Sequence, residues 1–400
     1  MLFVKLTHIK VCLNGKNDFG ASAEMMSRGH DAFAPAQDNR ETIHGDCMKP
    51  SAAPAMRLTI LCCLAIGMTL PLAGCASDGS TYGNTSGAPA TGVYVIQNHA
   101  ASGTTAASAS VLQFSSTASG AATPVSAITN LNVTSLGFLA IDGTGNLYTA
   151  ATQGTTGTSL VEFPVGSQNN AQPIRSIPFN TTTGLTTLYS LSAGTAGNLF
   201  ASNGAGGVDL FSSTATGSVA PTSTVSITSG AGPQATAVDG SGNLYVATAT
   251  PTNSTAIAPI EVFAPGTSST VPTRTIGGAL TNLALTTPKA LATDTAGNLY
   301  VANVVSGVSS ILVFEPTATG NTPPMRDITG SNTLLGCVGG IAVDTEGGYL
   351  YVVSTPTCGS TASPTVLKFS TTGTGNIAPV SSFTSTVWTN PDPTLSIAVF

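Results

Sequence analysis

The chain has 400 residues and a formal net charge of −6 at pH 7, and only 8% of its residues are charged, against roughly 25% in typical soluble domains. From residue 76 onward, five basic and twelve acidic side chains give a formal charge of −7. So few dispersed cations cannot form a basic patch, which excludes nucleic acid as the expected partner. The surface must be covered mostly by Ser, Thr, Asn and Gly.

Residues 1–55 differ in composition from the rest of the chain. They hold six Lys or Arg, six Asp or Glu and three of the four histidines, and they contain no repeat. This difference favours a mis-assigned translation start, with Met48 or Met56 as the true first residue. A disordered extension is the alternative.

Residues 56–74 are typical of an export signal, with a basic start, a short apolar stretch and a small-residue exit. The apolar stretch is shorter than the roughly 20 residues that a membrane-spanning helix needs. Leu72-Ala-Gly-Cys75 resembles the lipobox of bacterial lipoproteins, in which the cysteine is lipidated and becomes the new N-terminus; an ordinary signal peptide is the alternative. In that class, Ala76 after the cysteine favours the outer membrane. Residues 75–91 are expected to be the lipidated cysteine and a flexible tether.

A repeated turn and strand organises residues 92–400. The stretch Asp239-Gly-Ser-Gly-Asn-Leu-Tyr-Val-Ala247 has related copies that end in aromatic residues every 45 to 55 residues, at Tyr94, Tyr148, Phe200, Tyr245, Tyr300 and Tyr351. Asp, Gly and Asn suit a tight reversal, and the apolar run that follows is typical of a strand. This period matches one blade of a β-propeller.

Three further strands are predicted in each period. An apolar run precedes the turn, a strand ending in Phe follows the Tyr strand, and a strand led by Pro comes last. Since Pro cannot donate to a ladder, the last strand is predicted to form the outer edge of a four-stranded blade.

The two ends of the repeat region complement each other. The first copy begins at a second strand, Gly92 to Gln97, and the chain ends on an unpaired first strand, 395–400. Joining them completes a sixth blade. The sequence therefore predicts an all-β fold, a six-bladed β-propeller closed by its C-terminal strand.

This pattern resembles the NHL-repeat and SMP-30/gluconolactonase-like group of six-bladed propellers. The resemblance covers about residues 92–400 and implies the fold, but propellers host many unrelated activities. Gluconolactonase-like relatives hold a divalent metal at the channel mouth with Glu, Asn and Asp side chains. The residues expected near that mouth include no acid: they are Gln97, Ala151, Asn203, Thr248, Asn303 and Ser354.

Chemistry-bearing clusters are scarce after Cys75. His99 is the only histidine, so any Ser-His-Asp triad would have to use it, and no His cluster or Cys-x-x-Cys offers a transition-metal site. The turn carboxylates Asp142, Asp239, Asp294 and Asp344 could suggest calcium, but capping of their own turns explains them. We expect no cofactor.

Cys337 and Cys358 fall at the same end of two antiparallel strands, which favours a disulfide over two buried thiols.

The connections between second and third strands vary in length, at 98–110, 204–207 and 249–259, and variable loops on a regular scaffold are where recognition usually lies. The connection holding Trp388, Asn390 and Asp392 is expected to lie beside Asn98 and His99, with Lys289 near the channel mouth. These six residues are the candidate binding site; the alternative is that Trp388 fills a gap beneath the loop. The tether is expected to enter on the opposite face, so that this site points away from the membrane.

The sequence favours a non-enzymatic, lipid-anchored module of the bacterial cell envelope that binds a protein or glycan. A metal-dependent lactonase, hydrolase or lyase of the gluconolactonase-like type is one alternative. A structural part of a larger envelope assembly is another.

Overall fold

A computed structural model describes residues 91–400 except 103, 105, 130, 155, 205, 228–231, 250–256, 258, 284–287, 306, 359, 361, 386 and 389–395. The predicted signal segment, the lipidation site Cys75 and the tether up to residue 90 therefore lie outside the described residues. No helix within the described residues is long and apolar enough to cross a membrane.

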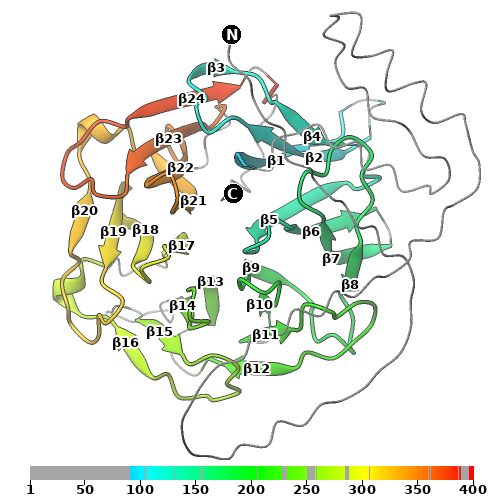
Figure 1. Ribbon diagram of the computed structural model, residues 1–400, viewed down its shortest axis with the longest axis horizontal. Coiled ribbons are helices and arrows are strands. Elements are labelled where there is room, and N and C mark those ends of the chain that lie inside the picture. Colours follow the sequence, from blue (N-terminus) through cyan, green and yellow to red (C-terminus); the bar gives the residue numbers. More distant parts are fainter. Residues whose placement is uncertain are drawn as a thin grey trace, which may run out of the picture. The chain divides into compact units, whose positions relative to one another are not determined.

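Six antiparallel blades form a ring, which confirms the predicted β-propeller (Figure 1). The closing blade consists of β25 (Ile397–Val399), β1 (Val93–His99), β2 (Ser108–Phe114) and β4 (Ser126–Ile128). The next two blades are β5 (Ser135–Ile141), β6 (Leu147–Gln153), β7 (Gly157–Phe163) and β8 (Arg175–Pro178), then β9 (Leu188–Ala193), β10 (Leu199–Asn203), β11 (Gly207–Phe211) and β12 (Ser223–Ser226). The fourth blade is β13 (Pro233–Val238), β14 (Leu244–Thr248), β15 (Ile260–Phe263) and β16 (Arg274–Ile276). The last two are β17 (Ala290–Thr293), β18 (Leu299–Val305), β19 (Val308–Phe314) and β20 (Arg326–Ile328), then β21 (Cys337–Asp344), β22 (Tyr349–Thr355), β23 (Thr365–Ser370) and β24 (Ser381–Ser385).

The repeated aromatic residues form the buried layers between blades. The largest fully buried side chains are the repeat tyrosines of four blades and the Phe that ends each third strand. Because each sheet is covered by a neighbour on both faces, its middle strands are apolar on both sides, as β18 shows with six consecutive buried residues.

The repeated turn is held by a network of Asp, Asn and Tyr. The Asp142 carboxylate accepts hydrogen bonds from the Asn146 amide N–H (3.0 Å), the Asn146 side chain (3.1 Å) and the Tyr148 hydroxyl (2.8 Å). Asp239 and Asp294 repeat this arrangement with their own Asn and Tyr. The copy that has Gly194 in place of Asp has Phe200 in place of Tyr, so the loss of the carboxylate acceptor leaves no Tyr hydroxyl unpaired in that turn.

The ring closes as the sequence predicted. Strand β25 pairs with β1, and Gly92 and Phe400 exchange backbone hydrogen bonds of 2.7 and 3.2 Å. The regular strand covers 397–399, a shorter span than the predicted 395–400. In Figure 1 the C-terminus lies beside β1 at the inner rim.

The two sides of the ring are built from different connections. We call the side with the repeated turns the turn face, and the side with the connections from second to third strands and from blade to blade the loop face. Thr91 lines a cavity on the turn face together with turn residues, which confirms that the described chain enters from that side.

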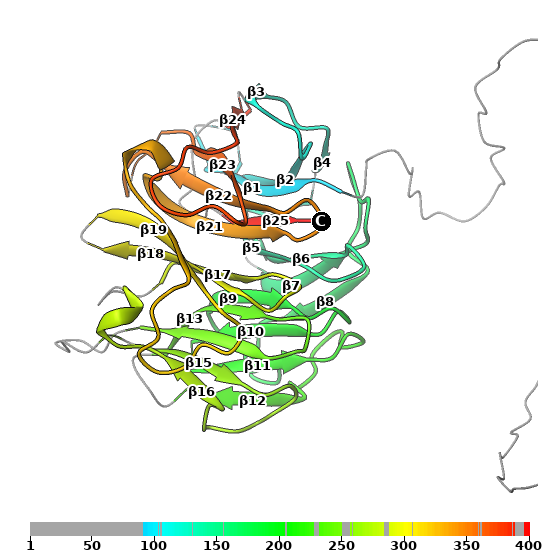
Figure 2. The ribbon, with the colours of Figure 1, turned by 60° about the vertical axis from the view of Figure 1, so that its left-hand side comes forward.

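The outer strands are covered more fully than the sequence predicted. They do begin two residues after each Pro and stand outermost. However, the connection between the third and fourth strands of the following blade hydrogen-bonds to this edge at five junctions. The contacts are the parallel pairing of β24 with β3 (Gly120–Ala122), three isolated bridges, and a bond of 2.7 Å from the Gly217 amide to the Ser176 carbonyl. Neighbouring blades are thus joined at the rim as well as in the core (Figure 2).

A disulfide joins Cys337 and Cys358 with a Cα–Cα distance of 4.8 Å, as predicted. It ties the start of β21 to the connection after β22 on the loop face. In the chain-entropy model, closing a loop of this length stabilises the fold by about 3 kcal/mol.

Candidate functional site

The centre of the ring opens on the loop face into a cavity of about 220 Å³. First strands from all six blades line it, including Phe138, Tyr189, Gln234, Lys289, Gly339 and Ser396. Lys289 and Ser396 directly precede their first strands and the other four lie within theirs, so residues from the whole ring meet at one opening. We call this opening the loop-face mouth.

A β-bulge recurs where the first strands enter the mouth. Pairing with the second strand skips one residue in four blades, namely Phe138, Tyr189, Gln234 and Gly339. In a fifth blade the Lys289 amide donates to the Ala302 carbonyl (2.9 Å) while Ala290 pairs with the same residue. A bulge bends its strand and re-aims a side chain, and bulges are common beside functional sites. The bulges place Tyr189, Gln234 and Lys289 around the opening, at positions where the packing of the repeated blades does not require a particular side chain.

Lys289 is the only exposed basic side chain among the described residues. The other four basic side chains are less exposed and have contacts within the protein: Arg175 pairs with Glu162 at 2.7 Å, Arg274 and Arg326 donate to Tyr245 and Tyr300, and Lys368 donates to the Ser116 carbonyl. No acidic residue is among the described residues that line the loop-face mouth. The mouth therefore presents one cation, which is positioned to meet an anionic or strongly polar group.

The wall of the mouth is fixed in an unfavourable backbone conformation. Phe138 has a φ of 58°, which is uncommon for a bulky residue and is found where the surrounding structure enforces it. The amide of Leu139, next in the chain, donates to the Ser396 hydroxyl of the closing blade at 2.7 Å. In the first strand of the β21–β24 blade, Gly339 and Gly340 leave room for a ligand to approach the backbone. Tyr189, 42% exposed, lies in the first strand of the β9–β12 blade.

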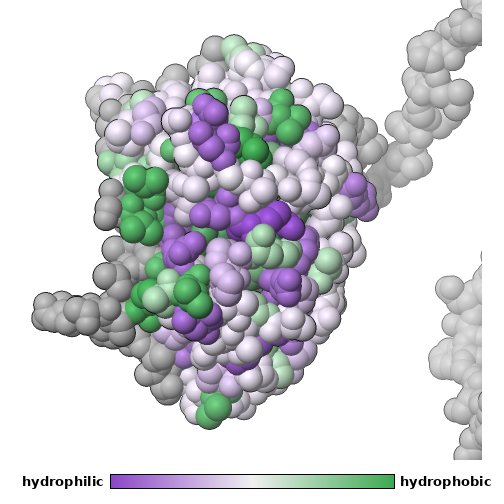
Figure 3. Space-filling model, turned by 90° about the vertical axis from the view of Figure 1, so that its left-hand side faces the viewer, coloured by the Kyte–Doolittle hydropathy of each residue, from purple (hydrophilic) through white to green (hydrophobic). Residues whose placement is uncertain are grey.

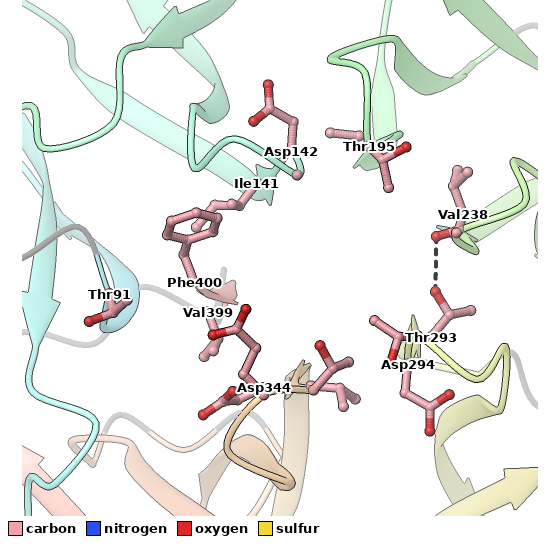
Figure 4. Close-up of a pocket in the computed structure, with 17 residues that line it drawn as sticks. Thr91, Ile141, Asp142, Thr195, Val238, Thr293, Asp294, Asp344, Val399 and Phe400 are labelled. Atoms are coloured by element: carbon pink, nitrogen blue, oxygen red, sulfur yellow. Dashed lines mark hydrogen bonds between the residues drawn. The ribbon is translucent and has the colours of Figure 1, made fainter. Parts of the chain in front are cut away.

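The centre of the ring also opens on the turn face, and we call this opening the turn-face mouth. It is acidic, but the Asp carboxylates of the repeated turns accept hydrogen bonds within those turns. Its cavity of about 380 Å³ is lined by Asp142, Asp294, Asp344 and Glu346. Figure 4 shows the carboxylates of Asp142 and Asp294 pointing away from the opening, towards their own turns. In the described residues no group of three His, Cys, Asp or Glu side chains is suited to hold a metal.

Asp142 links the stability of its turn to pH. Burial raises the pKa of this carboxyl, but hydrogen bonds from Thr144, Tyr148 and Asn146 outweigh burial and leave the pKa below its usual value. The stabilisation that these hydrogen bonds provide is therefore complete above the unfolded-state pKa of Asp142, and it is lost as pH falls through the folded-state pKa.

We expect Asp142→Asn to lower the free energy of unfolding by about 1–3 kcal/mol at neutral pH. In urea unfolding the difference should shrink below about pH 4; a difference independent of pH would contradict the assignment.

Of the residues of the predicted binding site, Lys289 lines the loop-face mouth, whereas Asn98, His99 and Trp388 do not line that cavity. Asn98 is buried and its side chain bonds both backbone groups of Leu136 in the next blade, at 2.9 and 2.8 Å. His99 is half-buried at the end of β1. Asn390 and Asp392 lie outside the described residues, so a site uniting all six stays a prediction.

Trp388 lies in the core, which is the packing alternative that the sequence left open. It is 6% exposed, packs edge-on against Phe114 with ring centroids 5.5 Å apart, and stacks on Phe383 at 6.2 Å. It fills the space between the closing blade and the β21–β24 blade.

Sequence reasoning missed Tyr189 and Gln234. It sought the mouth three residues after each repeated aromatic, yet those six positions do not line the loop-face mouth, and the first strands lie between them and the channel axis. A signal was present for Gln234, because Gly or Pro lies at or directly before the bulged residue in three strands, at Gly137, Pro233 and Gly339, and such residues in a strand often mark a bulge. The strand of Tyr189 contains neither residue.

Comparisons with known proteins support the fold alone. No family model matches the chain, and no curated protein matches it. A protein of unknown function from Bacteroides caccae is similar in structure, with a TM-score of 0.50 and 9% sequence identity over 78% of this chain and 99% of the other. A chain in the crystal structure of a nidogen/laminin complex has a TM-score of 0.48 and 14% identity over 77% of this chain and 98% of its own length.

Proposed function

We propose that this propeller is a non-enzymatic recognition module of a bacterial cell envelope, carried on a lipid at Cys75, and that it binds a protein or glycan at the loop-face mouth. The observation that carries the proposal is the ring of bulges, which brings Tyr189, Gln234 and Lys289 to one opening. An aromatic ring, an amide and an exposed ammonium supply stacking, hydrogen bonding and charge without forming a catalytic set.

Exposed apolar side chains add to the case for the loop face. Six of the large exposed hydrophobic residues are on its connections or at its mouth: Tyr189, Leu280, Val305, Val308, Leu334 and Val387. In Figure 3 green groups gather towards the left edge, the side on which the β18–β19 hairpin lies in Figure 2. Apolar contacts around a charged centre are typical of interaction surfaces.

The resemblance to NHL-repeat and gluconolactonase-like propellers belongs to the same proposal. A divalent metal bound at the loop-face mouth would favour a lactonase or related hydrolase over a recognition module. The mouth's own chemistry favours recognition, because the one charged side chain among the described residues that line it is a lysine, and a cation repels a metal ion.

We expect Lys289→Ala to reduce partner capture from detergent-solubilised envelopes by about tenfold or more, because truncating a central charged contact leaves its partner group unpaired. The measurement is quantitative mass spectrometry of co-purified material. Glu346→Ala is the matched control, since it truncates one exposed charge at the opposite mouth. Equal loss in both variants, or no loss in either, would contradict recognition at the loop-face mouth.

The anchor is tested separately. Cys75→Ala should leave unprocessed precursor or release soluble protein, because the proposed lipid is attached through this thiol. Fractionation and intact-mass measurement would follow both species. Peptides from residues 1–47 on the mature protein would contradict both the lipidation site and the proposed later translation start.

A further inference from the structure

One of the six junctions between neighbouring blades is open at the rim. At the other five, the connection between the third and fourth strands of one blade bonds to the outermost strand of the blade before it. The sixth junction would join β12 to the connection 264–273 of the next blade. Both segments are described, and no backbone hydrogen bond joins them. In Figure 1, β12 forms the outer edge of its blade, beside the β13–β16 blade.

The closed junctions share one way of bonding. At one of them the Gly320 amide donates to the Thr275 carbonyl at 2.6 Å, and the Gly320 carbonyl accepts from the Gly277 amide at 2.9 Å. The bonding residue lies six positions after the Phe that ends the third strand, and its φ is positive at every closed junction. These residues are Gly120, Asn169, Gly217, Gly320 and Gly375. Gly adopts positive φ readily and Asn tolerates it, so a single such residue can satisfy the edge.

The connection 264–273 lacks this residue. It is one residue shorter than the other five between the Phe and the Pro, and its sixth position holds Ser269, which does not have a positive φ. By strand register, Thr224 and Ser226 in β12 are equivalent to Thr275 and Gly277. The Thr224 carbonyl and the Ser226 amide therefore have no backbone partner in the described part of the chain.

The open edge is accessible to solvent at Ser226. This residue is exposed, whereas Thr129, Gly277 and Thr329, at the same position of three closed junctions, are half-buried. Unpaired amides and carbonyls at the edge of a sheet are a template for pairing with another chain, and extended peptides bind proteins by adding to such edges. The edge of β12 thus offers one acceptor and one donor to an approaching backbone.

We propose that the outer edge of β12 binds an extended segment of a partner protein, which runs parallel to β12 and carries a Gly or Asn at its centre. This central residue donates its amide to the Thr224 carbonyl and accepts from the Ser226 amide, as Gly320 does at its own junction. Recognition is through the backbone, and the Gly or Asn supplies the positive φ. No residue of β12 lines the loop-face mouth, so the proposal stands independently of the proposed function.

The direction of pairing favours a separate segment over a second copy of this chain. Two copies related by a twofold axis would pair β12 with itself in antiparallel fashion, because such an interface is the same on both sides. The segments bridged to the closed edges run parallel to the outermost strands, both where β3 pairs with β24 and at the three isolated bridges.

The test uses a probe copied from a closed junction. The peptide Ala-Thr-Gly-Asn-Thr-Pro, the sequence of residues 318–323, is acetylated, amidated and titrated into the full chain labelled with nitrogen-15. We expect saturable shifts of the amide resonances of Val225, Ser226 and Ile227, with the largest at Ser226. The same peptide with N-methylglycine in place of glycine lacks the donor and should bind about tenfold more weakly or worse. Equal binding of the two peptides, or no saturable shift, would overturn the proposal.

Ser226→Pro removes the donor from the edge and should weaken peptide binding by about tenfold or more, as followed at Val225 and Ile227. The variant should fold, because Pro178 occupies the equivalent position of β8. Ser226→Ala is the matched control, since it keeps the amide and should bind as the wild type does. Unchanged binding in Ser226→Pro would show that the peptide does not use this edge.

Hydrogen exchange tests the open edge without a ligand. The Ser226 amide should exchange about tenfold faster or more than the amides of Thr129, Gly277 and Thr329, which donate to the neighbouring connections. Equal protection of Ser226 would mean that the edge is already covered, and it would overturn the proposal. Dimerisation of the chain that Ser226→Pro abolishes would overturn it as well, because a second copy would then be what binds the edge.

Discussion

Removing residues 396–400 should abolish cooperative folding of the propeller. The segment supplies the innermost strand of the closing blade, buries Ile397 and Ala398, and contributes the backbone bonds between Phe400 and Gly92. Its loss also takes the Ser396 hydroxyl from the Leu139 amide. We expect a loss on the order of 5 kcal/mol or more, comparable with the whole stability of many domains, seen as a broad, non-cooperative transition in thermal unfolding.

Rescue in trans provides the control for this deletion. A peptide of residues 395–400 added to the truncated protein should restore a cooperative transition in a concentration-dependent way, because binding stabilises the folded state by mass action. A peptide of the same composition in scrambled order should not. A truncated protein that melts like the full-length chain would show that the ring does not close through β25.

Trp388→Ala should be the most destabilising single substitution among the residues discussed, at about 3–5 kcal/mol. The side chain contacts Phe114 and Phe383 in the interface between two blades, so truncation leaves a cavity that the rigid sheets cannot close. Chemical denaturation of the variant measures the effect. Val387→Ala, one residue away and 39% exposed, should change stability by less than about 1 kcal/mol. Similar small effects for both variants would mean that Trp388 does not pack in the core.

The repeat made most of the fold predictable. A turn that needs Asp, Gly and Asn, a strand that needs a buried Tyr, and an edge strand that can accept Pro each leave a local pattern, and six copies make the pattern unambiguous. The pairing of Cys337 with Cys358 followed from the same register, because strand pairing fixes which ends meet. The bonds between rims of adjacent blades were not predictable, since they join backbone groups and place no demand on side chains.

The candidate site was less accessible to sequence reasoning for two physical reasons. A bulge inserts one residue in a strand without changing its apolar character, so Tyr189 and Gln234 read as ordinary strand positions. The only Trp in the chain suggested a surface contact, but an aromatic residue in a connection can equally fill a gap between sheets, as Trp388 does. Lys289 was recognised because it directly precedes a predicted first strand, which places it near the channel mouth.

Site-specific photo-crosslinking in intact cells tests recognition at the loop-face mouth most directly. Benzoylphenylalanine is placed at position 234, at the loop-face mouth, or at position 346, at the turn-face mouth. We predict a discrete crosslinked species from position 234 that disappears when Lys289→Ala is added, and none from position 346. Crosslinks from position 346 alone, or a species at position 234 unaffected by Lys289→Ala, would contradict a binding site at the loop-face mouth.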